Sequence, residues 1–346
     1  MKIRYWGVTG SYPRAAEPAE FTERVAQAIV ALQRAGTLQS INDRLPNAAE
    51  VATLVKQNLP PQQHAALGGQ TTCIEVQTPV SLIILYAGTG LSDLGRDLEC
   101  RWSAADYSGQ RVAHLLLSHA HMDHVQGLPF AMPLYDPANH VTLHALQPVL
   151  DGLAALMNEH STLQGILFPT TTTMLAGIKQ YQPIQPGKQF VIGATTIDSL
   201  HLHHPTACVA YRLTSGGKKF VFATDFEQTV PPDPKLIEFC RDADLLYADA
   251  QFLQSEYDGQ TPVRDERPVS RAGWGHSTVE ATVELAVAAC VRRLHLGHHD
   301  PRRTDAGLYD LERHAKTLAI RLLKSQNLPA KLLQVELARQ AESGVL

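Results

Sequence analysis

Short apolar runs recur along the chain, separated by segments in which apolar residues repeat at helical spacing. Apolar or alternating runs bounded by turn-forming residues predict β-strands. Such runs lie at 2–7, 72–76, 81–86, 112–117, 141–144, 190–192, 195–202, 207–213, 219–223 and 293–296. Helical spacing predicts a helix beginning within 125–132 and helices at 148–158, 278–291 and 305–326. Strands in two groups with helices between them predict an α/β (α+β) fold, in which two sheets pack face to face beneath outer helices.

Residues 17–66 have a different pattern, without strand-like runs. Apolar residues from Phe21 to Leu32 repeat at helical spacing, and 48–58 is a second candidate helix that ends before Pro60 and Pro61. We predict that 17–66 is a helical insertion within a single domain spanning 1–346. Such an insertion can serve as a lid or as a dimer contact.

Composition narrows the class of protein. The 346 residues are enough for one large domain, and an apolar content of 44% supports a substantial core. A net charge of −4 without basic clusters disfavours nucleic acid as a partner. The five cysteines lack Cys-x-x-Cys spacing, which is typical of a reducing compartment. With no signal-like or membrane-spanning apolar stretch either, we predict a cytoplasmic protein with no membrane partner.

The candidate chemistry begins directly after the apolar run at 112–117. Four side chains that can bind metals follow within six residues: His119, His121, Asp123 and His124. Imidazole and carboxylate are the groups through which proteins bind Zn, Mn or Fe(II). In extended backbone His119 and His121 point the same way, and Asp123 and His124 follow at the turn. One loop can therefore contribute to sites for two metal ions.

The spacing His-x-His-x-Asp-His resembles the signature of the metallo-β-lactamase superfamily. This resemblance implies a four-layer αββα sandwich with an N-terminal helical insertion, and a centre for two divalent metal ions. It implies that His119, His121 and a later histidine bind the first ion. Asp123, His124 and another later histidine then bind the second. We expect Zn, with Mn as the alternative, because nitrogen and oxygen ligands accept both.

The resemblance also indicates where the later ligands lie. Counting back from a tyrosine in the following strand gives His204 as the third ligand of the first ion, with His203 as the alternative. Asp225 ends an apolar strand, where the family has a carboxylate that bridges the two ions. His298 matches the last ligand, with His299 as the alternative.

A further segment, Gly273-Trp274-Gly275-His276-Ser277-Thr278, resembles the phosphodiesterase branch of the superfamily, which includes ribonuclease Z. In that branch the histidine contacts the scissile phosphate or protonates the leaving oxygen. The implied role of His276 is therefore catalytic. Segments 68–73 and 87–90 match the same branch, whereas the long arm with which ribonuclease Z grips tRNA is not visible.

Two positions depart from the family pattern. Tyr86 stands where the family has an aspartate that orients the metal-binding loop, and Ala248 stands where a histidine is common. The departure at Tyr86 is expected to alter metal affinity or the geometry of the loop.

Together these matches imply a dinuclear-metal-dependent hydrolase. The implied reaction is phosphodiester hydrolysis of a small or cyclic substrate by a metal-bridging hydroxide, with Asp123, Asp225 and His276 as catalytic residues. One alternative is a carboxylic-ester, lactone or thioester hydrolase of the same fold. Another is a module that binds a nucleotide or partner with weak catalysis. A homodimer formed through 17–66 is compatible with each.

Overall fold

Two seven-stranded sheets form the centre of the protein in a computed structural model, which describes residues 1–37, 47–59, 65–105, 107, 109–159, 168 and 170–346. In spatial order the first sheet contains β14 (Ser343–Val345), β1 (Lys2–Gly7), β2 (Cys73–Gln77), β3 (Leu82–Leu85), β4 (Val112–Leu116), β5 (His140–Leu146) and β6 (Ile178–Ile184). The second contains β13 (Gln334–Leu337), β12 (Arg293–Gly297), β11 (Leu245–Asp249), β10 (Lys218–Ala223), β9 (Cys208–Ser215), β8 (Thr195–Leu202) and β7 (Phe190–Ile192).

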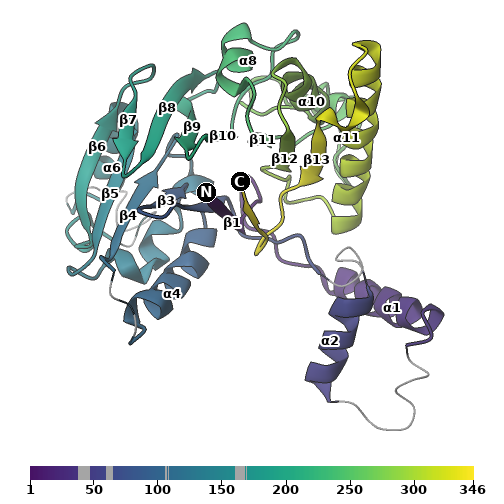
Figure 1. The fold of residues 1–346 in the computed structure, drawn as a ribbon, viewed down its shortest axis with the longest axis horizontal. Coiled ribbons are helices and arrows are strands. Elements are labelled where there is room, and N and C mark those ends of the chain that lie inside the picture. The colour runs from purple at the N-terminus through teal and green to yellow at the C-terminus, as the bar shows by residue number, and fades with distance from the viewer. Residues whose placement is uncertain (38–46, 60–64, 106, 108, 160–167, 169) are drawn as a thin grey trace.

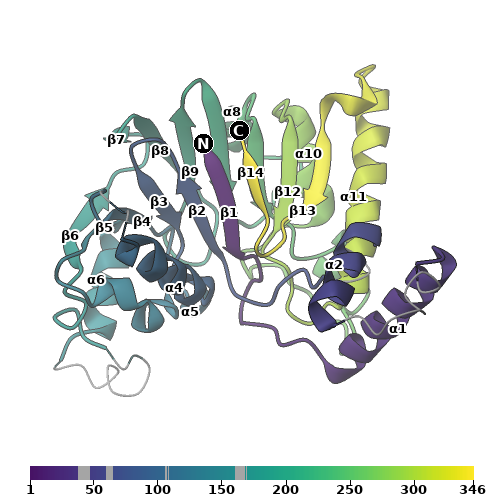
Figure 2. The same cartoon turned by 60° about the horizontal axis from the view of Figure 1, so that its bottom comes forward.

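Helices cover the outer faces of both sheets (Figures 1 and 2). The α-helices are α1 (Pro18–Arg34), α2 (Ala48–Asn58), α4 (Gly90–Ser103), α5 (Met122–Val125), α6 (Gln147–Leu156), α8 (Pro234–Cys240), α9 (Gln254–Tyr257), α10 (Val279–Ala288) and α11 (Asp305–Ser325). Short 3₁₀ helices are η2 (Leu128–Phe130), η3 (Met132–Leu134) and η4 (Ala330–Leu332). The predicted αββα sandwich of two mixed sheets is confirmed.

The core has two parts because each sheet buries apolar side chains on both of its faces. One part lies between the sheets and beneath α4 and α6, and includes Leu85, Leu116 and Phe222. The other lies between the second sheet and α8, α10 and α11. Strand β11, which pairs in parallel with β10 and β12, is buried along its whole length. This explains its continuous apolar sequence, since inner parallel strands meet helices or another sheet on both faces.

Chain direction brings the chemistry to one edge of the sandwich. Strands β10, β11 and β12 run parallel, so their carboxyl ends meet, and Asp225, Asp249 and His298 lie at those ends. The loop after β4 in the first sheet carries His119 to His124 to the same edge. The chain between β1 and α1 joins the two halves there, because Thr9 forms β-bridges with residues from both.

The helices α1 and α2 stand away from the two sheets, beside the lower end of α11 (Figures 1 and 2). Arg14 and Arg24 hold this segment by ion pairs of 2.9 and 2.6 Å to Asp305, the first residue of α11. Within the predicted insertion, 38–46 and 60–64, including Pro60 and Pro61, lie outside the described residues. A lid or dimer role for 17–66 stays a prediction. Among the described residues, no helix has the length and apolar character needed to cross a membrane.

The predicted helix beginning within 125–132 is wrong. Helix α5 ends at Val125, and 3₁₀ helices η2 and η3 follow, each with a proline in its first turn. Gly127 lies between α5 and η2, in close contact with the backbone of Gly88. The prolines lack an N–H group for continued helical bonding, so the segment proceeds in short turns.

Candidate metal centre

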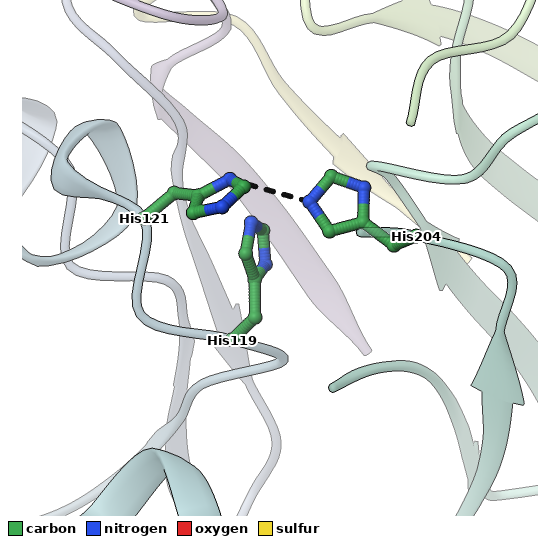
Figure 3. A group of neighbouring side chains, drawn as sticks. All are labelled: His119, His121 and His204. Carbon is green, nitrogen blue, oxygen red and sulfur yellow. Dashed lines mark hydrogen bonds between the residues drawn. The ribbon is translucent and has the colours of Figure 1, made fainter. Parts of the chain in front are cut away.

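Three histidines from two loops converge at the edge where the strands end. His119 and His121 follow β4, His204 follows β8, and their rings face one another (Figure 3). Nε2 of His204 lies 3.2 Å from Nδ1 of His121. Nδ1 of His204 donates to the carbonyl oxygen of Gly275 at 3.0 Å, since a carbonyl can only accept. This hydrogen bond leaves Nε2 of His204 unprotonated and facing the other two rings.

A second group contains only buried side chains: Asp123, His124, Asp225 and His298. Nε2 of His124 lies 3.0 Å from Oδ2 of Asp123 and 3.2 Å from Oδ1 of Asp225. Nε2 of His298 lies 3.2 Å from each of the same two oxygens. Two carboxylates and two imidazoles therefore point at one small volume, drawn from three separate segments of the chain.

Asp225 connects the two groups. Its Oδ1 atom lies 4.0 Å from Nε2 of His119 and also faces His124 and His298. Nε2 of His119 is buried and has no hydrogen-bond partner among the described residues. A buried unpaired nitrogen is costly, and a bound cation would pair it. The nitrogen and oxygen donors present are those that divalent transition metals take, so these residues fit the metal ions that the fold implies.

The electrostatics of the two groups differ. Burial lowers the pKa of His119 well below 6.5, lowers that of His121, and lowers that of His204 to about 4. These three rings are therefore neutral at pH 7, which is the form that binds metals.

In the second group the carboxylates outweigh burial. Burial disfavours a proton on His124 and on His298, but the charges of Asp123 and Asp225 raise the pKa of His124 to about 10 and that of His298 to about 9. Burial likewise opposes ionisation of both aspartates, but the two imidazolium charges hold the pKa of each well below 3.8. Positive charge is thus stabilised at the point where a divalent cation would lie.

Backbone strain accompanies this arrangement. Asp225 and His298 have φ angles of 60° and 55°, in the left-handed region that non-glycine residues rarely adopt. Such residues persist where the surrounding structure holds them, and they concentrate at functional sites. Here each side chain turns from a strand end toward the second group.

The segment after β1 also supports the centre. The backbone N–H of Ser11 donates to Oδ2 of Asp123 at 2.9 Å. Gly10 packs so closely on His298 that a methyl group in its place would overlap the ring. Sequence reasoning missed both contributions, because a backbone N–H carries no residue signal and a glycine before a turn has many explanations.

His276 lies beside both groups, with a side chain that is 13% exposed. Its Nδ1 atom lies 2.9 Å from Oδ2 of Asp249 and 3.9 Å from Oδ1 of Asp225. The ring stacks on His298, with centroids 5.0 Å apart. Since Asp249 occupies Nδ1, Nε2 is the ring nitrogen that remains for a bound molecule.

Glu227 was also missed. It is 9% exposed and accepts hydrogen bonds from the backbone N–H groups of Gly273 at 3.1 Å and Gly275 at 2.6 Å. The carbonyl of Gly275 in turn holds His204, and His276 is the next residue. Glu227 therefore fixes the loop that carries His276 and orients His204. Its sequence context offers no pattern that would have identified it.

The alternative histidines lie elsewhere. His203 stands outside the groups, and its backbone carbonyl accepts from Glu227. His299 is buried and donates from Nε2 to the carbonyl of Ala338 at 3.0 Å, away from the two carboxylates. The structure thus brings together His119, His121, Asp123, His124, His204, Asp225 and His298, with His276 adjacent. Ala248 is buried within β11 and contributes no polar side chain.

Comparisons with known proteins identify the family and the fold. A family model described as a beta-lactamase superfamily domain matches residues 93–299. No curated protein matches the sequence. The solved metallo-beta-lactamase fold protein YhfI from Bacillus subtilis is similar over 99% of both chains, with 16% identity and a TM-score of 0.58.

Two further solved structures are similar over almost the whole chain. A diphosphatase from the PhnP family aligns over 100% of this chain and 97% of its own, with 14% identity and a TM-score of 0.55. Human tRNase Z, short form, aligns over 100% and 99%, with 13% identity and a TM-score of 0.54. At such identities the likeness extends to the fold alone.

The family match covers more than half of the chain and includes every residue of the two ligand groups. The two mixed sheets and their outer helices are consistent with the fold of these structural neighbours. This fold is found mostly in hydrolases and implies binding of divalent metal ions. The chain therefore belongs to the beta-lactamase superfamily and has the metallo-β-lactamase fold.

Proposed function

We propose that this protein is a dinuclear-metal-dependent phosphodiesterase that hydrolyses a small or cyclic phosphodiester. The observation that carries the proposal is the position of His276, paired with buried Asp249 and adjacent to both ligand groups. A metal centre alone serves many hydrolytic reactions. A histidine beside it, held by a carboxylate, adds a group that can protonate a leaving oxygen.

The proposed ligands follow the two groups. His119, His121 and His204 would hold the first ion, and Asp123, His124 and His298 the second, with Asp225 between them. Divalent ions bound there, with Zn as the first choice and Mn as the alternative, would supply a water of lowered pKa and positive charge for the phosphate oxygens. Because both carboxylates are buried, they stay ionised only when positive charge lies beside them.

His276 acts at the leaving group in this proposal. Asp249 accepts a hydrogen bond from Nδ1 and orients the ring, so that Nε2 can donate a proton to the departing oxygen. The loop that Glu227 holds fixes the ring relative to His204. The charges of Arg271 and Arg302 are offset, because both side chains pair with Glu266. This supports a small substrate over a nucleic acid.

Two similar solved structures are consistent with phosphoester chemistry, since one is named a diphosphatase and another a tRNase Z. The centre would act on a phosphodiester whose identity the loops around it select. No partner beyond this substrate is required by the proposal, and a cytoplasmic location remains part of it.

The test combines metal analysis with substrate comparison. Purified protein is expected to bind two equivalents of Zn²⁺ or Mn²⁺ and to hydrolyse bis(p-nitrophenyl) phosphate faster than a lactone or a thioester. His276→Ala should lose about 10²-fold or more in rate while keeping its metal content. Preferential lactone turnover, or equal loss of metal and rate in His276→Ala, would reject the proposal. His314→Ala, on the outer surface of α11, serves as the control.

A further inference from the structure

Tyr86 occupies a strained and fully buried position directly behind the two ligand groups. Its φ angle is 67°, and its side chain has no exposed surface. The ring lies against His124, with centroids 4.1 Å apart, and meets Phe222 edge-on at 4.8 Å. A non-glycine residue in this conformation is held there by its surroundings, which suggests that its hydroxyl group has a defined task.

The hydroxyl of Tyr86 contacts three oxygen atoms. It donates to Oδ2 of Asp225 at 3.2 Å, and it accepts from Oγ1 of Thr224 at 2.8 Å. It also forms a hydrogen bond with Oγ of Ser118. Ser118 in turn lies 2.9 Å from Nδ1 of His119.

The number of protons available fixes which group donates in each hydrogen bond from His119 through Ser118 and Tyr86 to Asp225. The carboxylate of Asp225 can only accept a hydrogen bond, so the single hydroxyl proton of Tyr86 is used in the hydrogen bond to Asp225. Ser118 must then donate a hydrogen bond to the hydroxyl oxygen of Tyr86. Because Ser118 has no second proton, Nδ1 of His119 must be the donor in the hydrogen bond between Ser118 and His119. An ordinary phenol is protonated at pH 7, so the hydroxyl of Tyr86 has a proton to donate.

The thiol of Cys208 is a further group that could form hydrogen bonds with Ser118 and His119. Its sulfur lies 3.5 Å from Oγ of Ser118 and 3.7 Å from Nδ1 of His119. The backbone carbonyl of Asp225, also at 3.5 Å, gives the thiol an acceptor of its own. The thiol is a weak donor, so the stronger oxygen and nitrogen pairs decide the direction of the chain.

We propose that Tyr86 is a positioning residue whose hydrogen-bond chain, from His119 through Ser118 to Asp225, sets the tautomer of His119 and the orientation of Asp225. The inference rests on the proposed metal centre. With its proton on Nδ1, His119 has an unprotonated Nε2, which would be free to bind the first ion. With Oδ2 held by Tyr86, Asp225 presents Oδ1 to both groups. The hydroxyl of Tyr86 thereby links the orientation of His119, a proposed ligand of the first ion, to that of Asp225, the carboxylate shared by both groups.

The test uses Tyr86→Phe and Ser118→Ala, which break the chain at different points. Tyr211→Phe is the matched control, because Tyr211 is also fully buried and donates to the carbonyl of Leu117 at 2.7 Å without contacting a proposed ligand. Zn²⁺ and Co²⁺ affinities are measured by competition with a chromophoric chelator. Tyr86→Phe and Ser118→Ala should lose about tenfold or more in affinity, and the Co²⁺ absorption spectrum should change. Tyr211→Phe should lose only stability.

A second readout uses the metal-free protein. Nitrogen NMR should find the proton of His119 on Nδ1 in the wild type and in Tyr211→Phe. In Tyr86→Phe the freed Ser118 hydroxyl can donate to Nδ1, which moves the proton to Nε2. Metal affinities and a His119 tautomer that match those of Tyr211→Phe in both variants would overturn the inference. If the wild type binds neither ion, the metal centre is rejected. The tautomer of His119 still shows whether the hydrogen bonds through Ser118 and Tyr86 set the position of its proton.

Discussion

Oδ2 of Asp249 joins His276 to Asp225, because it lies 2.9 Å from Nδ1 of His276 and accepts the backbone N–H of Asp225 at 3.1 Å. Asp249 is fully buried and also accepts the backbone N–H of Gln251 through Oδ1. One carboxylate therefore fixes the proposed proton donor relative to the proposed bridging ligand. The two cannot move independently without leaving a buried charge unpaired.

Asp249→Asn tests this relationship. The neutral amide accepts a weaker hydrogen bond from Nδ1 and holds the ring of His276 less firmly, so the rate of phosphodiester hydrolysis should fall by about 10²-fold. The double variant with His276→Ala should be little slower than either single variant, because the two residues act as a unit. Rates and metal content are measured together. Multiplicative losses in the double variant would show that Asp249 acts by another route.

Gly275 allows a test of how accurately His204 must be placed. Gly273 and Gly275 have φ angles of 81° and 85°, so alanine strains the backbone similarly at both positions. A methyl group at Gly275 would overlap the ring of His204, whereas at Gly273 it would meet no atom within 4 Å.

We therefore expect Gly275→Ala to lower the thermal midpoint of unfolding more than Gly273→Ala, which adds only backbone strain, and we expect Gly275→Ala alone to weaken metal binding. Titration with Zn²⁺ in the presence of a chelator measures the affinity of each variant. About a tenfold difference between them is expected, as for other changes that displace a ligand imidazole. Equal affinities would mean that His204 is not a ligand or tolerates displacement.

Glu227 makes a separate prediction, because it acts on the loop and not on a ligand directly. The carboxylate of Glu227 accepts from the N–H groups of Gly273 at 3.1 Å and Gly275 at 2.6 Å. Glu227→Gln keeps only one acceptor oxygen and has no charge, so it cannot hold both N–H groups. The loop should become more mobile, with a loss of rate that exceeds the loss of metal. Hydrogen exchange at Gly275 and steady-state kinetics measure the two effects. Glu238→Gln, at an exposed surface pair with Arg241, is the control.

The sequence allowed the metal loop and the strand ends to be predicted because their signals are local. The apolar run before Asp225 and the histidine spacing from His119 onward each lie within one short segment. The family resemblance singled out His204 and His298 from neighbouring histidines, and the geometry now brings both to the same edge. Their role as ligands remains a prediction for the metal titrations.

Other features depend on contacts between distant segments, which no local pattern encodes. Strand β14 pairs with β1 at opposite ends of the chain, through Lys2 and Val345 among others. Strand β6 is an edge strand with five exposed central residues, so its polar sequence hid it. The partners of Tyr86 lie 32 to 139 residues away, which is why only its departure from the family pattern could be seen beforehand.

His144, on β5 and away from the metal groups, predicts a pH dependence of stability. Its Nε2 atom lies 3.1 Å from Nδ1 of His114, and its ring stacks on Phe190 at 5.3 Å. The side chain is nearly inaccessible, and burial, with a smaller contribution from His114, lowers the pKa of His144 from 6.5 to about 4. Such a ring stays neutral in the folded protein at pH values where the unfolded chain is protonated.

Above pH 6.5 both states are neutral at His144, and the free energy of unfolding does not depend on this group. Between pH 6.5 and 4 the unfolded state binds a proton that the folded state does not, so stability falls with decreasing pH. The loss attributable to His144 between pH 7 and pH 5 is about 2 kcal/mol. His144→Gln should remove it, whereas His140→Gln, at an exposed position on the same strand, should not. Urea unfolding of the three proteins at both pH values measures the difference, and parallel pH profiles for wild type and His144→Gln would contradict a neutral buried ring.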